Sequence, residues 1–534
     1  MRTDFRRGRT LGWAATLVIA SIVSAVSSAR AQDTARARVD SAAADTVARG
    51  AADRVPRERR SQRFRASPLL PPDHWAVRAA ARLEGMGLAP GYLPAQRAVP
   101  RQTVALVLER AAERTARGRP DLAYLTEGWW TRFREEFREY GEDLPAPGLA
   151  PLGSFAGAGA QGWAGRLEPR VRDDPPAPIP DRTEGAARVQ VAWAAGRHFA
   201  GASEETFGTD AGADVPRWEL VAAAGNVALS VGDQPVAYGW GRAGGFVFAD
   251  PDPLPRVELQ TTAPTRLGGP LGFLGTMSFH AFASRLDEDR HAGDPWMWGA
   301  RLALRPRERL TLGVTRGAIF GGDVAEVTPG RLLRSLAGVI DQSFDNQILS
   351  FDLRWRLPTE RAAAATLYVE WASDDAGGGL NEQPAVLAGM YLPALPGMPN
   401  VALGLEHARI ARCCGHGSWY FHTEFRGYWA REGRPLGHPL GGGGSETRLY
   451  ADADLYDALL RVTADAFVRD RAQLAYDGSP GTLFAPDRTG TGGGASLGVE
   501  WRLSHRGELR LRGAHEGGDG WREQTFQAEL RYLF

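Results

Sequence analysis

The sequence contains no lysine, and its only cysteines are the adjacent pair Cys413 and Cys414. Two neighbouring cysteines cannot form the set of cross-links that stabilises small secreted domains. The pair is either incidental or a strained vicinal disulfide in a surface loop. Arginine alone supplies the positive charge, and basic and acidic residues balance at 63 each. No long-range field favours nucleic acid, so we expect no nucleic-acid partner.

Long apolar runs are also missing. Beyond the first 31 residues, no stretch approaches the roughly 20 apolar residues of a transmembrane helix. The chain starts with arginines before an apolar run from Leu11 to Ala25, and Ala29-Arg30-Ala31 follows. This order predicts a secretory signal peptide over residues 1–31. The exported protein must therefore cross any membrane with strands.

Motifs of the common catalytic sites are absent as well. We find no G-x-S-x-G, no H-E-x-x-H and no phosphate-binding glycine loop. The glycine runs 441–444 and 492–494 lie between strand-like segments, which is typical of loops. The sequence therefore predicts a protein that is not an enzyme, with no catalytic residue, no metal and no cofactor. A barrel enzyme that assembles its site from distant strands is kept as a second alternative.

Two segments precede the main part of the chain. Residues 32–67 are mostly small or charged, and they bury too little apolar surface to offset the entropy of ordering, so we expect a disordered linker. From residue 68 to 145 apolar residues recur every three or four positions, which predicts a small helical region. Three helices are expected, built around Trp75, Ala79, Leu83 and Met86, around Val104, Leu106, Val107, Leu108 and Ala111, and around Trp129, Trp130, Phe133 and Phe137.

The stretch from His74 to Arg110 resembles a surface-layer-homology repeat. His74-Trp75 opens the first helix, Gly91-Tyr92 marks the turn, and an arginine-led helix follows. The resemblance implies binding to cell-wall polymers, which would make peptidoglycan a partner of this region. The alternative is a helical plug or cap that packs on the rest of the protein.

From residue 150 to 534 the period changes to two. Apolar and polar residues alternate along short segments separated by glycine, proline and aspartate, as in Leu349–Leu357 and Leu497–Leu503. Charged residues inside so many strands would disrupt a sandwich core but suit a polar lumen. The predicted fold class is mainly β, a transmembrane antiparallel β-barrel of about 16–18 strands with a small N-terminal helical region. Tryptophans at segment ends fit interfacial girdles, namely Trp193, Trp296, Trp371, Trp419, Trp429 and Trp521.

The last ten residues, Thr525–Phe534, have the clearest alternation. Phe526 and Leu530 fall on one face with the terminal Phe534, and Glu529 falls on the other. An aromatic residue that closes an apolar-out strand resembles the C-terminal signature of bacterial outer-membrane barrels. We therefore expect an outer-membrane protein with outer-membrane lipid and the barrel assembly machinery as partners.

The side chains expected to face the lumen have both signs of charge. They are Arg301, Arg354, Arg356, Arg426, Arg448, Arg461, Arg502, Arg510 and Arg512, with Asp352, Glu370, Glu406, Glu424, Asp452, Asp454, Asp465, Glu500, Glu508 and Glu529. An anion pore would show an excess of one sign. Mixed signs favour cross-strand ion pairs that partly fill the barrel. The alternative is a wet lumen lined by solvated charges.

Three segments together resemble the Wzi family of capsule assembly proteins. Asp233–Phe248 has a Trp-Gly-x-Gly-like turn with a proline-rich stretch after it, although the turn here reads Trp240-Gly241-Arg242-Ala243-Gly244 and its second glycine is displaced. Leu367–Gly378 is similar to the family's strand that ends in an acidic loop. Trp419–Gly444 is similar to its tyrosine-rich strand and following Gly-x-x-Leu-Gly-His loop. The likeness covers roughly residues 150 to 534.

The resemblance implies an outer-membrane barrel that acts in the assembly or retention of capsular polysaccharide or exopolysaccharide through lectin-like binding. Sugar sites combine aromatic faces with planar hydrogen-bonding groups. The candidate polysaccharide-binding residues are Trp240, Arg242, His416, Trp419, Tyr420, His422, Glu424, Arg426 and Tyr428. Girdle aromatics, a lumen ion pair and a structural turn are the alternative for these residues. For the whole protein, the alternative is a passive porin or transporter.

Overall fold

The computed structural model describes most of the chain beyond the predicted signal peptide and linker. The described residues are 65–140, 149–165, 181–208, 214–249, 252–286, 294–322, 325–339, 341, 343–359, 363–374, 384–410, 419–422, 427–431, 434–471 and 490–534. Cys413 and Cys414 lie outside them, as do the signal peptide and nearly all of the linker. No helix in the described part of the chain is long and apolar enough to cross a membrane.

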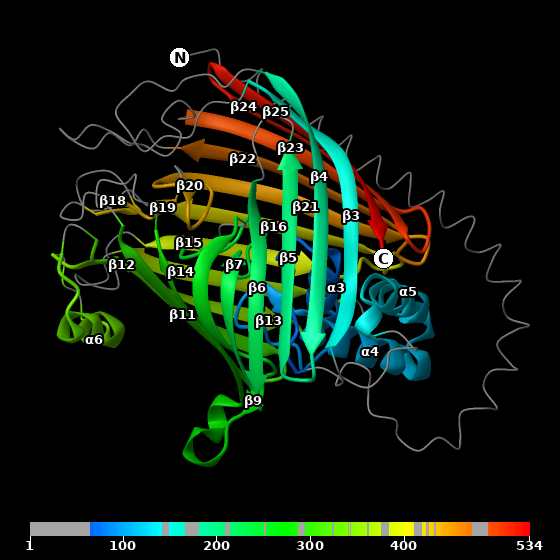
Figure 1. Cartoon of the computed structure of the whole chain (residues 1–534), viewed down its shortest axis with the longest axis horizontal. Helices are drawn as coiled ribbons and strands as arrows, with labels where there is room; N and C mark the ends of the chain where they lie inside the picture. Colours follow the sequence, from blue (N-terminus) through cyan, green and yellow to red (C-terminus); the bar gives the residue numbers. More distant parts are fainter. Residues whose placement is uncertain are drawn as a thin grey trace, which may run out of the picture.

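The described strands form a closed antiparallel barrel (Figure 1). Its eighteen long strands are β3 (Leu149–Ala164), β4 (Arg182–Ala195), β5 (Phe199–Gly208), β6 (Asp214–Ala224), β7 (Val227–Gln234), β8 (Leu254–Thr261), β10 (Thr276–Arg285), β11 (Trp296–Arg307), β12 (Leu310–Phe320), β13 (Asp345–Arg356), β14 (Thr366–Asp374), β15 (Ala385–Leu392), β16 (Val401–Ile410), β21 (Gly444–Leu455), β22 (Leu460–Arg471), β23 (Gly490–Arg502), β24 (Gly507–Gly518) and β25 (Trp521–Leu533). A short strand, β9 (Thr265–Arg266), extends the edge of β10. The predicted fold class is confirmed.

The last strand closes the barrel by pairing with the first. In β25, Phe526, Leu530 and Tyr532 are exposed on the outer face, whereas Glu529 and Arg531 are buried inside. The Phe534 amide donates to the Ser154 carbonyl at 3.0 Å, so the register continues to the last residue. Closure removes the free strand edges that a membrane cannot accommodate.

The two ends of the barrel differ. Turns such as Gly196–His198 and Gly225–Asn226 are short, whereas connections at the opposite end are long. Outer-membrane barrels have short periplasmic turns and long extracellular loops. One long connection, between β12 and β13, carries the helix α6 (Pro329–Ala337). Another carries four two-residue strands, β17 (Phe421–His422), β18 (Gly427–Tyr428), β19 (Ala430–Arg431) and β20 (Arg434–Pro435).

The three expected helices are present at the short-turn end (Figure 1). They are α3 (Trp75–Gly85), α4 (Arg101–Gly118) and α5 (Pro120–Glu136), with the short strands β1 (Leu69–Leu70) and β2 (Val99–Pro100) beside them. Trp75, Leu108, Trp129 and Phe133 are buried in an apolar core of their own, to which the β21–β22 turn adds Ala458. We call residues 65–140 the plug, because their charged side chains bind the barrel's inner wall.

Of the six tryptophans predicted for the membrane interfaces, Trp371 and Trp521 are half-buried, and the other four divide into two groups. Trp193 and Trp296 are exposed on the outer face, as a girdle requires. Trp419 and Trp429 are fully buried, so the prediction is wrong for them. They belong to a long connection that turns inward over the barrel, where a rule based on strand ends does not apply.

Candidate functional site

The connection between β7 and β8 folds back into the barrel. The Tyr238 amide donates to the Phe248 carbonyl at 2.9 Å, which closes residues 238–248 into a loop. Gly239 at its turn has φ +79°, and a Cβ there would lie 2.6 Å from the Glu370 carboxylate. Only glycine fits this position, because the backbone is left-handed and the wall is in contact with it.

Trp240, at the tip of this loop, binds the wall. Its indole Nε1 donates to Asp352 Oδ1 at 2.6 Å. The guanidinium groups of Arg301 and Arg354 lie 6.0 and 4.8 Å from the centre of its ring. Cation–π contacts of this kind are stronger where water is excluded. The turn that resembles the Wzi motif is therefore fixed to the lumen wall by its tryptophan.

Arg242 makes the second attachment. Its guanidinium donates to Asp452 at 3.1 and 3.2 Å and to Asp465 at 3.0 and 3.1 Å. Its backbone amide donates to Glu406 Oε2 at 2.7 Å. A planar guanidinium group pairs with two carboxylates at once only when both carboxylates are held in the right positions. Burial alone would lower the pKa of Arg242, but Asp452 and Asp465 outweigh it and raise that pKa well above the usual value.

The connection between β16 and β21 covers the first loop. Tyr420 Oη donates to the Phe246 carbonyl at 2.6 Å, and Trp429 Nε1 donates to the Val247 carbonyl at 2.6 Å. The Ala249 amide donates to the Leu436 carbonyl at 2.6 Å. We call residues 235–249, with the described parts of 419–443, the lid. Two segments that separately resemble the Wzi family thus form one structure.

Tyr420 is held in an unusual conformation within the lid. Its φ of 74° is left-handed, which is unfavourable for a bulky residue. The Asp374 carboxylate accepts its amide proton at 2.6 Å, and its hydroxyl accepts the His438 amide proton at 3.0 Å. Backbone strain of about 1–3 kcal/mol persists only where surrounding contacts impose it. The side chain is fully buried and supports the lid from within.

His438 is also fully buried in the lid, against Phe246. Its Nδ1 accepts the Leu440 amide proton at 3.2 Å, while Nε2 has no hydrogen-bond partner among the described residues. Burial lowers the pKa of His438 to about 4. The imidazole is therefore neutral at pH 7.

We expect the lid to weaken in acid. Because the folded pKa of His438 lies below the unfolded value of about 6.5, stability is full above pH 6.5 and falls as the pH drops toward 4, by about 3 kcal/mol at most. Hydrogen exchange at the hydrogen-bonded amides of Phe246 and Trp429 measures this opening. The control is His438→Asn, whose side chain retains an acceptor for the Leu440 amide but does not titrate. Intrinsic amide exchange changes with pH equally in both proteins, so the comparison removes that effect. If exchange depends on pH equally in the unchanged protein and in His438→Asn, then His438 does not control the opening of the lid.

The plug is bound to the wall from the other end. The Glu84 carboxylate accepts hydrogen bonds from Arg305, at 3.1 Å, and from Arg354, and Arg356 lies 3.9 Å away. Arg82 donates to Asp454 at 2.7 Å. Cross-strand pairs do occur, as between Arg461 and Asp454 at 3.4 Å. The prediction that wall charges pair mainly with each other is therefore incomplete, because Arg354 and Arg356 use a carboxylate of the plug.

Plug and lid touch inside the barrel. Arg97, between α3 and α4, donates from its guanidinium to the Gly241 carbonyl at 2.8 Å. Its backbone amide donates to the Ala237 carbonyl at 2.8 Å. The lumen is thus filled from both ends by segments that are about 140 residues apart in the sequence. Burial lowers the pKa of Arg97, with Arg242 adding to the effect.

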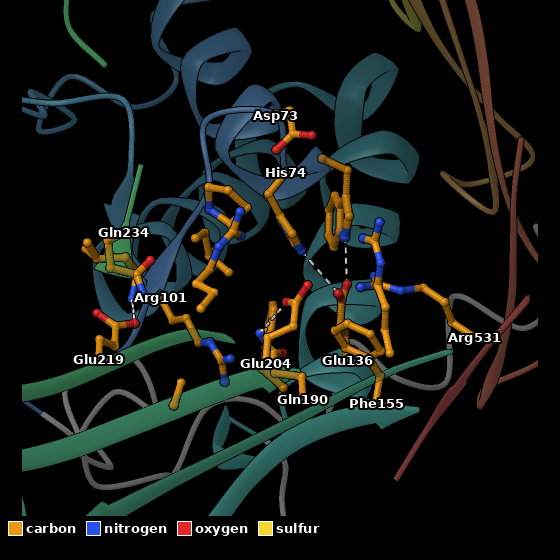
Figure 2. Close-up of a pocket in the computed structure, with 18 of the residues that line it drawn as sticks. Asp73, His74, Arg101, Glu136, Phe155, Gln190, Glu204, Glu219, Gln234 and Arg531 are labelled. Carbon is orange, nitrogen blue, oxygen red and sulfur yellow. Dashed lines mark hydrogen bonds and ion pairs between the residues drawn. The ribbon is translucent and has the colours of Figure 1, made fainter. Parts of the chain in front are cut away.

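A cavity of about 160 Å³ lies between the plug and the inner wall (Figure 2). Its polar lining includes His74 and Glu136 from the plug and Glu204 and Arg531 from the wall. It is large enough for roughly five waters but smaller than the roughly 300–1,000 Å³ of ordinary ligand pockets. We interpret it as a hydrated space that solvates the buried charges.

The His-Trp pair at the start of α3 closes on one carboxylate. His74 Nε2 lies 3.1 Å from Glu136 Oε1, and Trp75 Nε1 donates to Glu136 Oε2 at 2.6 Å. Burial alone would raise the pKa of Glu136, but His74, Arg132 and Arg510 outweigh it and hold that pKa well below the usual value. The motif read as a surface-layer-homology repeat therefore joins α3 to α5 within the plug.

The structure describes some of the candidate polysaccharide-binding residues but not others. Trp240, Arg242, Trp419 and Tyr420 come together in the lid, although their contacts are with protein. His416, Glu424 and Arg426, and the side chains of His422 and Tyr428, lie outside the described residues. The sequence interpretation missed Glu84, Arg97 and His438. Signals existed for two of them: Glu84 is the one acidic residue of the first helix, and His438 is the histidine of the Gly-x-x-Leu-Gly-His loop.

Comparison with known proteins identifies the family. The model of the family described as "Capsule assembly protein Wzi" matches residues 160–518, about two thirds of the chain. The chain belongs to the Wzi family. The helical plug precedes the matched range, and the resemblance of residues 74–110 to a surface-layer-homology repeat is not supported. Among curated proteins, no relative matches this Wzi-family chain.

A solved structure shares the fold of this Wzi-family barrel. Wzi from Escherichia coli, described as an outer membrane protein involved in group 1 capsule assembly and a carbohydrate-binding β-barrel, is 15% identical with a TM-score of 0.68. The alignment covers 88% of this chain and 100% of that chain. OpdQ from Pseudomonas aeruginosa is 11% identical over 72% of this chain and 97% of its own, with a TM-score of 0.44. The family and the closed barrel place the protein in the outer membrane.

Proposed function

We propose that this Wzi-family barrel acts in the assembly or retention of capsular polysaccharide or exopolysaccharide, and that it holds polymer at its long-loop end without conducting solutes. Family membership supports the role in capsule assembly, and the carbohydrate binding described for the Escherichia coli protein supports the ligand class. The contact of Arg97 with Gly241 is the observation that supports the absence of conduction, because plug and lid meet there inside the barrel and a pore needs a continuous wet path.

The polymer contacts the outer surface of the lid and the neighbouring long loops. Trp240, Arg242, Trp419 and Tyr420 are occupied by protein contacts, so we assign them to holding that surface in place. The remaining candidates, His416, His422, Glu424, Arg426 and Tyr428, supply the aromatic and hydrogen-bonding groups that sugars need. Many weak contacts along one polymer add through multivalency.

No chemical step is needed for this role. Among the described residues, no group of three or more histidine, cysteine or acidic side chains is arranged to hold a metal ion. Retention requires only noncovalent contacts, so we propose that the protein is not an enzyme. The barrel assembly machinery and peptidoglycan stay predictions from the sequence.

We expect a deletion strain to release polymer into the medium while synthesis continues. Complementation with a Glu424→Ala, Arg426→Ala, Tyr428→Ala variant should restore the barrel but not retention, because these changes remove three of the proposed polymer-binding side chains. Cell-bound and released polymer are measured together with conductance of the purified barrel in a planar bilayer.

Complementation with Tyr124→Ala, a change at an exposed plug residue, is the matched control and should restore retention. Large stable channels together with unchanged retention in the deletion strain would contradict the proposal and favour a porin.

A further inference from the structure

The connection between β12 and β13 lies on the outside of the barrel, unlike the lid. Outward positions near the long-loop ends of β11, β12 and β13 are covered there. Trp298 is 9% exposed, Ala318 0% and Phe320 6%, and Phe344 of the connection packs against them at 0%. Farther down the same face, Val314 is 36% exposed and Phe351 41%. Figure 1 shows α6 beside the wall, outside the strands.

The covered wall is polar where a lipid-facing wall should be apolar. Three polar residues occupy outward positions of this wall. Arg316 pairs with the outward Leu349, Gln347 with Ala318, and Asp345 with Phe320. Arg316 donates to Gln347 and lies 6.0 Å above the Trp298 ring. A Cβ on Gly338, at the end of α6, would collide with the Arg316 guanidinium. The connection therefore shields three polar side chains that would otherwise meet lipid.

The sequence fixes α6 as a helix at both ends. Thr328 Oγ1 accepts the Arg331 amide proton at 3.3 Å, and Pro329 follows it at the first helical position. Gly338 ends the helix with φ 89°, and the Val339 amide donates back to the Arg334 carbonyl at 2.9 Å. Nine residues are too few for a stable isolated helix. Caps and packing on the wall hold it in place.

The other face of α6 is apolar and exposed. Leu333 is 66% exposed and Leu336 50%, and Val327 and Val339 are exposed on either side of the helix. Leu332, on the inner face, packs against the covered wall. The helix has two charged residues: Arg334 is exposed at the edge of the apolar face, and Arg331 is half-buried with its guanidinium 5.5 Å from the centre of the Phe344 ring. A short helix with this division is typical of the membrane interface.

The height of α6 along the barrel axis also fits the membrane interface. Tilted strands rise roughly 2.5 Å per residue along the barrel axis, so the eleven residues of β12 span about 25 Å, the height of the apolar band. Ala318 and Phe320 therefore lie at its upper boundary. The exposed Trp296 beside them is positioned as an interfacial tryptophan.

We propose that α6 is a membrane-interface helix, whose Leu333 and Leu336 enter the acyl chains of the outer leaflet while Arg334 binds the lipid phosphates above them. The apolar face continues the lipid-facing surface of the barrel across a place where its wall is polar. This inference depends on the outer-membrane barrel and is independent of polysaccharide binding.

Spin labelling tests the proposal on the full chain in vesicles of phosphatidylcholine and phosphatidylglycerol. Nitroxides are placed by Leu333→Cys and Leu336→Cys in a Cys413→Ser, Cys414→Ser background. Collision rates with oxygen, which enters lipid, are compared with those of a nickel chelate, which stays in water. Leu530→Cys on the outer face of β25 is the lipid reference, and Arg117→Cys at an exposed position of α4 is the water reference.

We expect the oxygen-to-nickel ratio at positions 333 and 336 to match that at 530 and to exceed that at 117 several-fold. Leu332→Cys, on the covered face, should be protected from both probes. A ratio at 333 and 336 equal to that at 117 would place the helix in water and overturn the proposal. Protection of 333 and 336 from both probes would overturn it in favour of a second protein surface, such as another copy of the chain.

Discussion

Glu84→Gln should release the plug from the barrel wall. The carboxylate of Glu84 lies among the guanidinium groups of Arg305, Arg354 and Arg356, and all four side chains are buried. Removing one partner of a buried ion pair leaves uncompensated charge and costs about 3–5 kcal/mol. The amide retains the shape of the side chain but not its charge. We therefore expect much faster proteolysis of the plug and a lower thermal unfolding temperature.

Glu308→Gln is the matched control for this loss. Glu308 accepts a hydrogen bond from the same Arg356 at 3.1 Å, but its side chain is 67% exposed. Exposed ion pairs contribute about 0–1 kcal/mol because water screens them. Plug proteolysis in Glu308→Gln should therefore remain close to that of the unchanged protein. Similar small effects of both substitutions would show that Glu84 does not hold the plug.

Phe351→Arg should prevent most of the protein from folding into the membrane. Phe351 is exposed on the outer face at the middle of β13, where lipid replaces water. An arginine at the bilayer midplane of a barrel costs about 2–4 kcal/mol, and the cost falls to about 0–1 kcal/mol near an interface. Urea unfolding in lipid vesicles and heat-modifiable mobility on gels measure the folded fraction.

Trp355→Arg tests the same substitution on the same face at a different depth. Trp355 is also exposed, but it lies one residue before the end of β13 at the short turns. The arginine side chain can reach water there. We expect the Phe351 variant to lose two or more kcal/mol beyond the Trp355 variant. Equal losses, or a larger loss at Trp355, would show that the membrane is centred elsewhere on the barrel.

The local sequence determined the barrel wall. Along β13, the side chain of Phe351 points outward and that of Asp352 inward because successive strand residues face opposite sides. A shift by one residue would place Asp352, Arg354 and Arg356 in lipid, so the pattern allows one register. The plug helices were equally predictable, since Trp75 and Leu83 recur at helical spacing and Gly85 and Gly87 mark the end. Both predictions depend on contacts between neighbours in the chain.

Only the tertiary structure decided what fills the barrel and what covers it. Trp429 looks like a girdle residue in the sequence, yet its indole binds Val247 inside the lid. Glu84 and Arg354 are 270 residues apart, and no periodic pattern relates them. A connection turns inward or outward according to the distant surface that it buries, as the lid and α6 show. Closure of the barrel brings those surfaces together, and that is why their partners could not be predicted from local spacing.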